Sequence, residues 1–485
     1  MILPLLVACG KEETPDVDVT EKYYYDDSSR ERAADSIPDD YDLENQTISF
    51  FTRADQDKNI WGDSENTDIV YSKIYERNLS VEERLNVQIE FIPSGTTSWQ
   101  EASDVLKREI QTMSTAWEAA FTSNNTVIQK KLFNYFHNMN DSAYIDISER
   151  WWYEDATMEL SVDNYNYRFL YGDIHISGIG TCGVIFYNKD LYEQYLSPNK
   201  DREELYQKVL DGKWTLEEFA RLVKNSRIER GGDGTADIYG IVFENAEAHH
   251  HFREGVGIVI YERNAQGMPV FNINNDKSVD FTNMMYEFCY ENNGVLTDIP
   301  TEYSGAFANN LTIFELQTLN SVLGDTKREM KSDFGILPYP KWDEAQEEYR
   351  TLIHNSSTMA CVPVSTDIDR ANEEVSAVIE ALCSESYRRV AISYYETALK
   401  TAYTRDDLDA QMIDIITGQH DTIKSVLTKN FAYEYSASLG GIGFMISTIV
   451  RTEKSNNFAS KYDSIIDQAN SGLKELIQQY KDGKI

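Results

Sequence analysis

The sequence predicts an α/β fold divided into two domains, and three observations support this prediction. The chain has 485 residues, whereas a single hydrophobic core stops growing near about 250–300 residues. Between positions 47 and 121, apolar segments of strand length alternate with segments of helical apolar spacing. The same alternation returns between positions 183 and 290, so a second α/β unit is expected.

The first unit has the order strand, helix, strand, helix, strand. We expect a strand at 47–51, a helix at 68–86, a strand at 87–91, a helix opened by the capping box Ser98–Glu101, and a strand at 119–121. This order favours a parallel sheet with helices on its faces.

The second unit repeats this pattern at positions 183–187, after the capping box Thr215–Glu218, at 238–242 and at 279–290. Short strands are expected at 334–338 and 359–362. From Asn372 onwards the chain should be mostly helical.

The chain is strongly acidic. Its 81 Asp and Glu residues against 45 Lys and Arg residues give a net charge of −36. Contact with phosphates needs a basic footprint, so this balance argues against nucleic acid as a partner. It also argues against adsorption to anionic lipid.

Five cysteines are spread over the chain without a C-x-x-C pair, which argues against the common zinc patterns and a disulfide scaffold. We expect Cys182, Cys289, Cys361 and Cys383 to be buried free thiols. The fifth, Cys9, ends the run Leu6-Val7-Ala8-Cys9, which matches the bacterial lipobox. We interpret positions 1–9 as the remnant of a truncated lipoprotein signal with Cys9 as the lipidated residue.

Positions 10–46 carry many carboxylates and lack apolar periodicity, so we expect a disordered acidic linker. No segment reaches the roughly 18 to 20 apolar residues that span a bilayer. The membrane would therefore be reached through the lipid alone, on the extracellular face.

Sequence motifs of common enzymes are missing. The chain contains no G-x-S-x-G, no H-E-x-x-H, no phosphate-binding loop and no G-x-G-x-x-G after a strand. We therefore expect neither catalysis nor a cofactor.

Two segments resemble metal sites without completing one. His249-His250-His251 lies near Glu247, but adjacent side chains on an extended segment point to opposite faces. We expect a polar loop there, which could face a ligand. The calcium-like loop at 229–240 places Gly240 where a bidentate Glu is required. We therefore expect no metal site.

Four motifs, in order, resemble those of bacterial extracellular solute-binding proteins of the sugar type (family 1), in particular the clostridial members. They are Tyr187-Asn188-Lys189-Asp190-Leu191, the segment 212–219 beginning Gly-Lys-Trp-Thr, Asp237-Ile238-Tyr239-Gly240, and the segment 333–341. Within the first motif we expect Asn188 to end the strand and Lys189 to lie at the surface. The resemblance covers position 47 to the C-terminus.

This resemblance implies a periplasmic-binding-protein-like fold, in which two α/β lobes close on a ligand about a hinge. Lobe one would comprise 47–175 and 339–398, and lobe two 176–338 and 399–485. The crossings would fall near 173–178, 337–340 and 396–402. Such proteins deliver their ligand to the permease of an ABC importer, and we expect a monomer that binds a carbohydrate, with an oligosaccharide favoured.

The ligand would lie in the interlobe cleft at the strand ends, where aromatic rings could stack on sugar and polar groups could hold hydroxyls. The predicted ligand-binding residues all lie in loops: Asp55, Trp61, Asn124, Asn125, Trp152, Asp173, Glu244, Asn245 and Tyr435. We place Trp61 and Trp152 at the cleft rim of lobe one. Two alternatives stay open: a surface scaffold lipoprotein that tethers glycans without transport, and a peptide-binding protein of the same fold.

Overall fold

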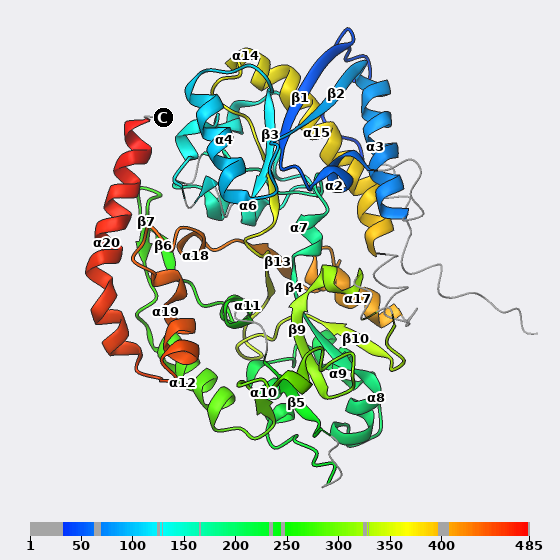
Figure 1. Cartoon of the computed structure of the whole chain (residues 1–485), viewed down its shortest axis with the longest axis vertical. Helices are drawn as coiled ribbons and strands as arrows, with labels where there is room; N and C mark the ends of the chain where they lie inside the picture. Colours follow the sequence, from blue (N-terminus) through cyan, green and yellow to red (C-terminus); the bar gives the residue numbers. More distant parts are fainter. Residues whose placement is uncertain are drawn as a thin grey trace, which may run out of the picture.

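The computed structural model describes residues 33–62, 69–123, 127–128, 130–163, 166–231, 236–243, 248–323, 327, 329–395 and 407–483. These residues form two α/β lobes, one above the other in Figure 1, joined by crossing segments. Within these ranges, no helix has the length and apolar character needed to cross a membrane.

Lobe one contains a four-stranded sheet in the order β12 (Thr358–Cys361), β3 (Ala119–Ser123), β1 (Gln46–Thr52) and β2 (Val87–Pro93). Strand β1 runs parallel to β2 and β3, as the sequence predicts. Strand β12 returns from lobe two and pairs antiparallel to β3. The sheet is therefore parallel in the part built by consecutive β-α-β units and antiparallel at the returning strand.

The helices of lobe one follow from local signals. Helix α4 (Trp99–Gln111) begins where the sequence predicts, because the Ser98 hydroxyl accepts a hydrogen bond from the Glu101 amide at 3.4 Å. Its α-helices also include α2 (Asp57–Trp61), α3 (Ile69–Leu85), α6 (Glu154–Leu160), α7 (Ser177–Gly180), α14 (Ile368–Arg370) and α15 (Ser376–Glu385).

Lobe two contains a five-stranded sheet in the order β10 (Phe334–Leu337), β4 (Gly183–Asn188), β9 (Thr312–Thr318), β5 (Tyr239–Val242) and β8 (Val295–Leu296). The central strand β9 was not predicted. It pairs antiparallel with β4 and parallel with β5, so its place depends on neighbours far away in the sequence.

Helix α10 (Leu216–Val223) is capped as predicted, since the Thr215 hydroxyl accepts from the Glu218 amide at 3.2 Å. Lobe two also contains α8 (Lys189–Leu191), α9 (Glu204–Leu210), α11 (Ala248–Gly255), β6 (Tyr261–Arg263), β7 (Pro269–Phe271), α12 (Asp276–Tyr290), α17 (Asp407–Ile416), α18 (Phe431–Glu434), α19 (Met445–Ser447) and α20 (Phe458–Asp482).

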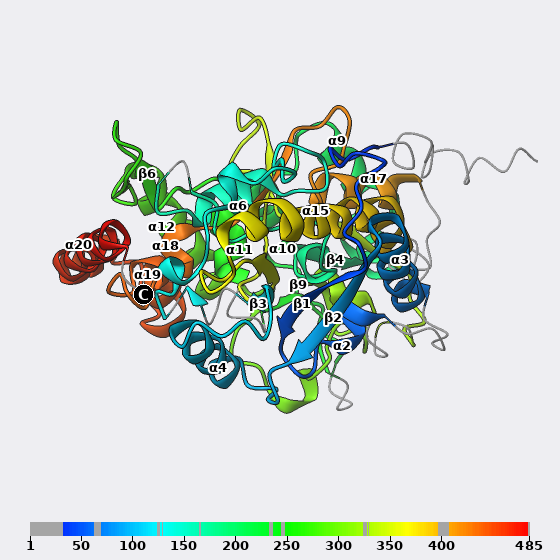
Figure 2. The ribbon, with the colours of Figure 1, turned by 90° about the horizontal axis from the view of Figure 1, so that it is seen from above.

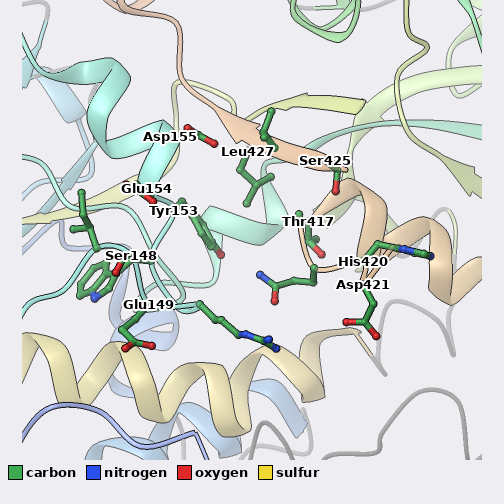
Figure 3. Close-up of a pocket in the computed structure, with 16 residues that line it drawn as sticks. Ser148, Glu149, Tyr153, Glu154, Asp155, Thr417, His420, Asp421, Ser425 and Leu427 are labelled. Atoms are coloured by element: carbon green, nitrogen blue, oxygen red, sulfur yellow. The ribbon is translucent and has the colours of Figure 1, made fainter. Parts of the chain in front are cut away.

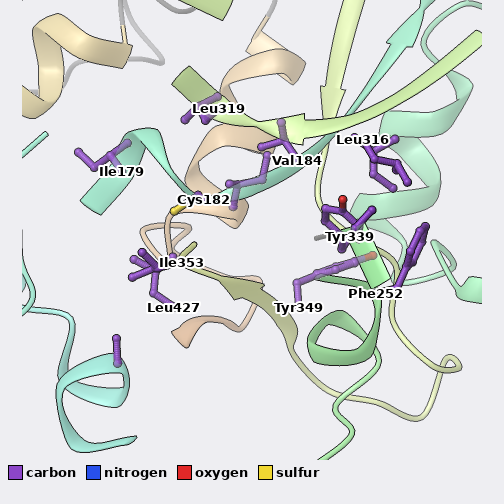
Figure 4. Close-up of a cluster of buried hydrophobic side chains, with 14 of the residues drawn as sticks. Ile179, Cys182, Val184, Phe252, Leu316, Leu319, Tyr339, Tyr349, Ile353 and Leu427 are labelled. Atoms are coloured by element: carbon purple, nitrogen blue, oxygen red, sulfur yellow. The ribbon is translucent and has the colours of Figure 1, made fainter. Parts of the chain in front are cut away.

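Two crossing segments lie side by side between the lobes. Leu170 bridges Ala360, Cys182 bridges Ile353, and the His354 amide donates to the Thr181 carbonyl at 3.0 Å. Next to them, β11 (Tyr349–Leu352) pairs in parallel with β13 (Ser425–Thr428). Figure 4 shows apolar side chains of these segments gathered with those of the lobe-two sheet.

The return to lobe one comes later than the predicted 337–340. The indole Nε1 of Trp214 donates to the Pro338 carbonyl at 2.8 Å, and Thr215 bridges Lys341, which keeps this stretch on lobe two. The chain reaches the lobe-one sheet through 353–358 instead. The predicted third crossing at 396–402 lies outside the described residues.

Part of the predicted linker is folded. Ile37 and Leu43 are buried on lobe one, and the Asp35 carboxylate accepts hydrogen bonds from Arg84 at 2.6 and 2.7 Å and from the Ser384 hydroxyl at 2.7 Å. Burial opposes ionisation, but the bonds to Arg84 and Ser384 outweigh it and lower the pKa of Asp35 to about 2. The prediction of disorder used the average composition of 10–46, which does not reveal that a few of its residues make specific contacts with lobe one.

The prediction that Lys189 lies at the surface is wrong. Its side chain is fully buried, with the ammonium 3.3 Å from the Asp409 carboxylate and 3.2 Å from Glu203. Partners supplied by distant elements make this burial possible. Asn188 does end the strand, because its side chain caps α8 by accepting from the Leu191 amide at 3.0 Å.

Candidate functional site

The loops after β1 and β2 are joined at the carboxyl edge of the lobe-one sheet. The Ser94 amide donates to the Thr52 carbonyl at 2.7 Å, and the Ala54 amide donates to the Thr96 carbonyl at 3.1 Å. In open α/β sheets, ligands bind outside the carboxyl ends of the strands. This edge is therefore the first place to search for a site.

The end of β3 leads directly to the interlobe crossings. Ser123 pairs with Thr358, whose amide donates to the Ser177 hydroxyl at 2.8 Å. The same hydroxyl lies 2.8 Å from Nδ1 of His175. Burial, reinforced by the charge of Arg77, lowers the pKa of His175 to about 3, so its imidazole is neutral.

On the lobe-two side, several aromatic side chains lie next to these crossing segments. The Asn355 amide donates to the Tyr433 hydroxyl at 3.1 Å, and the Tyr433 ring lies 4.6 Å from His250 and 5.2 Å from Phe444 between centroids. The Ser447 hydroxyl lies 3.4 Å from Nε2 of His250.

We call these residues, together with Ser177, the junction cluster: Ser177, His250, Asn355, Tyr433, Phe444 and Ser447. Ser177, Asn355, Phe444 and Ser447 are half-buried, whereas His250 and Tyr433 are buried beneath them. Burial, followed by the nearby Arg253 charge, holds the pKa of His250 well below its usual range.

The cluster therefore offers neutral hydroxyl, amide and imidazole groups beside an aromatic face. Hydroxyl and amide groups both donate and accept hydrogen bonds. Few polar groups placed around aromatic rings are typical of small-molecule sites. This chemistry suits a neutral ligand that carries hydroxyls and an apolar face.

A hollow away from the junction cluster, the hinge groove, lies between lobe one and the segment that joins α17 to β13. Its volume is about 380 Å³, and its walls come from 147–155 and 417–427 (Figure 3). Exposed carboxylates dominate it, namely Glu149, Glu154, Asp155 and Asp421. Figure 2 shows α6, which begins in this groove, and the arrowheads of β1 and β2 on opposite sides of lobe one. The groove is thus remote from the strand ends.

Neither the junction cluster nor the hinge groove, as far as the structure describes them, contains an evident metal site. Across the described ranges, His, Cys, Asp and Glu side chains form no group of three or more arranged to hold a metal ion. The calcium-like loop lies partly outside these ranges, at 232–235, and its Asp237 forms an ion pair with Arg227 at 2.7 Å.

The structure places the predicted ligand residues of lobe one in different environments. Asp55 is exposed but forms an ion pair with Arg53, whose guanidinium lies 3.6 Å from the centroid of the Trp99 ring. Trp61 is 40% exposed and meets Phe91 edge-on at 4.8 Å. Both follow β1, as predicted.

Three other predicted residues are buried. Trp152 is 4% exposed rather than at a rim, and its indole donates to Glu380 at 2.8 Å. The Asp173 carboxylate accepts from the Tyr153 hydroxyl at 2.5 Å, and Tyr435 is fully buried. Asn124, Asn125, Glu244, Asn245 and Cys9 lie outside the described residues.

Sequence reasoning missed Asn355, Tyr433 and Phe444 as site residues. The histidine run was the available signal, but the expected extended loop is wrong because 248–255 forms the buried helix α11. In a helix, His250 turns toward Tyr433 while His251 stacks on Tyr339. The four later cysteines are buried free thiols, as predicted.

No protein-family model matches this chain, and no curated protein matches it in sequence. Among solved structures, it is similar to a cyclo/maltodextrin-binding protein complexed with maltotetraose, with 11% identity, a TM-score of 0.53, and coverage of 92% of this chain and 99% of that one. It is also similar to the sugar-binding protein MalE from Xanthomonas citri, with 12% identity, a TM-score of 0.55, and coverage of 90% and 99%. These likenesses confirm the predicted periplasmic-binding-protein-like fold of two lobes.

Proposed function

We propose that this protein is the substrate-binding subunit of an ABC importer and that it captures a carbohydrate, with an oligosaccharide favoured. The junction cluster is the observation that carries the proposal. It lies where the end of β3 meets the crossings, and it combines the Phe444 ring with neutral hydrogen-bonding groups. A sugar presents an apolar ring face and several hydroxyls, which match these two features.

The histidines in and beside the cluster agree with a neutral ligand, while the buried Arg253 guanidinium lies behind it, 5.8 Å from the Tyr433 ring centroid. His175 and His250 are held neutral by burial, so neither contributes a charge near pH 7. Binding would therefore depend on stacking and hydrogen bonds, with little sensitivity to salt. The hinge groove, with its exposed carboxylates, is a poorer match for such a ligand.

The remaining parts of the proposal concern delivery. The protein works without catalysis, as a monomer that a lipid on Cys9 holds at the extracellular face of the membrane. After lobe closure it presents the bound sugar to the permease subunits. The fold supports this role because two lobes on a hinge can enclose a ligand and then release it.

Calorimetry with maltose, maltotriose, maltotetraose and raffinose tests the proposal. Phe444→Ala should weaken binding about tenfold or more, because stacking of a ring on an aromatic side chain contributes on the order of 1–3 kcal/mol in related systems. Asp421→Asn, in the hinge groove, is the matched control and should bind as the parent does.

Two results would contradict the proposal. If Asp421→Asn lost saccharide affinity while Phe444→Ala retained it, the binding site would be the hinge groove. If the protein bound short peptides and none of the neutral saccharides, the ligand class would be peptide and the carbohydrate proposal would fail.

A further inference from the structure

Helix α20 (Phe458–Asp482) follows the edges of both lobes. It has 25 residues, which corresponds to about 37 Å at a rise of 1.5 Å per residue. Figure 1 shows it beginning beside α12 and α19 of lobe two and ending beside lobe one. Its later turns lie beside the lobe-one segment 131–134, since the Lys131 ammonium lies 3.3 Å from the Glu475 carboxylate.

The middle of α20 is fixed to lobe two by close backbone packing. A Cβ atom at Gly472 would lie 2.1 Å from the Ser438 carbonyl oxygen, so only glycine permits this approach. Ala469, Leu473 and Leu476 of the same helix are buried, and a Cβ atom at Gly440 would lie 3.1 Å from the Ala469 amide nitrogen. The helix therefore cannot shift along lobe two without losing this contact.

The last turns of α20 are bound to lobe one. The Tyr480 hydroxyl donates to the Asp163 carboxylate at 2.7 Å, and the Asn134 side chain donates to the Gln479 carbonyl at 2.8 Å. The Tyr480 ring also lies 5.9 Å from Phe133 between centroids. Asn134 is 6% exposed, so its bond is shielded from water.

The hairpin of β6 and β7 in lobe two also binds lobe one, at the end of α6. Arg263, on β6, donates to backbone carbonyls at the end of α6: Met158 at 3.1 Å, Ser161 at 2.7 Å and Val162 at 3.1 Å. The carbonyls at a helix end lack the amide partners of the helix interior. Met158 also accepts from the Ser161 amide at 3.2 Å, and the guanidinium adds donors to all three carbonyls.

We propose that α20 is an interlobe strap, with Tyr480 as its latch on lobe one. An α-helix does not lengthen without breaking its internal hydrogen bonds. A rotation that separates the lobes at this edge must therefore release one end of the helix. The middle of the helix is held on lobe two by backbone packing, so the Tyr480 end releases first. This inference does not depend on the ligand being a sugar.

The interlobe distance in the unliganded full chain tests the strap. Spin labels at Arg108→Cys in α4 and Glu217→Cys in α10 report it, since both parent residues are exposed and belong to different lobes. The four cysteines within the described part are buried, and Cys9→Ser is included throughout.

Tyr480→Ala should raise the population at longer distance about tenfold, because it removes the hydrogen bond to Asp163 and the ring contact with Phe133. Lys481→Ala, at the exposed neighbouring position, is the matched control and should keep the parent distribution. Tyr480→Phe keeps the ring and should give a smaller shift in the same direction.

An unchanged distribution in a folded Tyr480→Ala protein would overturn the proposal. If that variant does not fold, Tyr480→Phe decides: an unchanged distribution there also overturns it, and a longer one supports it. A shift of equal size in Lys481→Ala would mean that the end of α20 responds to any substitution, and it would overturn the role of Tyr480 as the latch.

Discussion

Replacing Glu380 with glutamine tests how lobe one holds a carboxylate inside its core. Glu380 lies on α15 and is 1% exposed. Its Oε1 accepts from the Trp151 indole at 2.7 Å, and its Oε2 accepts from the Trp152 indole at 2.8 Å. In the described part of the chain, the groups that shift the pKa of this carboxylate are the two indoles, Asp35 and Glu149, and no Lys or Arg is among them.

Burial raises the pKa of Glu380 from 4.5 to about 8, although the two indole hydrogen bonds act in the opposite direction. Between these two pH values the folded protein keeps a proton that the unfolded chain has released. Stability should therefore fall as pH rises from about 4.5 to 8, by up to about 1.4 kcal/mol per pH unit, and the fall should end above pH 8. The whole decrease is on the order of 4–5 kcal/mol.

Glu380→Gln removes the titratable carboxyl group, and this pH dependence of stability disappears with it. The amide oxygen can still accept from one indole, but the amide NH2 faces the other indole donor, which costs about 1–3 kcal/mol. Near pH 5 the parent should be the more stable protein. Near pH 8.5, where its carboxylate is ionised, the order should reverse.

Urea unfolding at intervals between pH 5 and 9 measures this crossing for the parent, Glu380→Gln and the exposed control Glu149→Gln. The control should follow the parent. Equal pH slopes in the parent and Glu380→Gln would refute the reasoning, because the slope would then come from other groups.

Three further predictions use other parts of the chain. Asp35→Ala should cost about 2 kcal/mol by unfolding, since it removes the carboxylate that binds half-buried Arg84, and the Asp35 contribution should vanish as pH falls from about 4 to 2; full stability in the variant would contradict this. Trp152→Ala should cost about 3–5 kcal/mol, whereas Trp61→Ala should leave the melting temperature nearly unchanged. Cys9→Ser, behind a complete signal peptide, should release the protein from the membrane fraction, and full retention there would exclude the lipobox.

The helix caps show what could be predicted from sequence. Ser98, Thr215 and Asn188 each bond to an amide three residues ahead, so the signal and its partner lie in one short segment. The parallel strands β1, β2 and β3 were predictable for a similar reason, since consecutive β-α-β units pair with their neighbours.

The junction cluster shows what could not be predicted. Asn355 and Tyr433 are 78 positions apart, and His250 comes from a third segment, so no window of sequence contains the site. Their approach depends on how α11, α18 and the crossing segment pack. Tyr433 and Tyr435 look alike in sequence, yet Tyr433 bonds to the crossing segment and Tyr435 is buried against Phe431.

By itself, the sequence determined the α/β class, the order of most strands and helices, and the motifs that resemble a solute-binding family. Those features depend on local hydrogen bonds and on the period of apolar residues, which a single segment contains. Tertiary structure alone decided that Lys189 is buried, that Asp35 forms an ion pair with Arg84, and that α20 reaches lobe one. Each of these depends on a charge or a backbone group supplied from a distant part of the chain, because burial of a polar group is tolerated only where its partner is already in place.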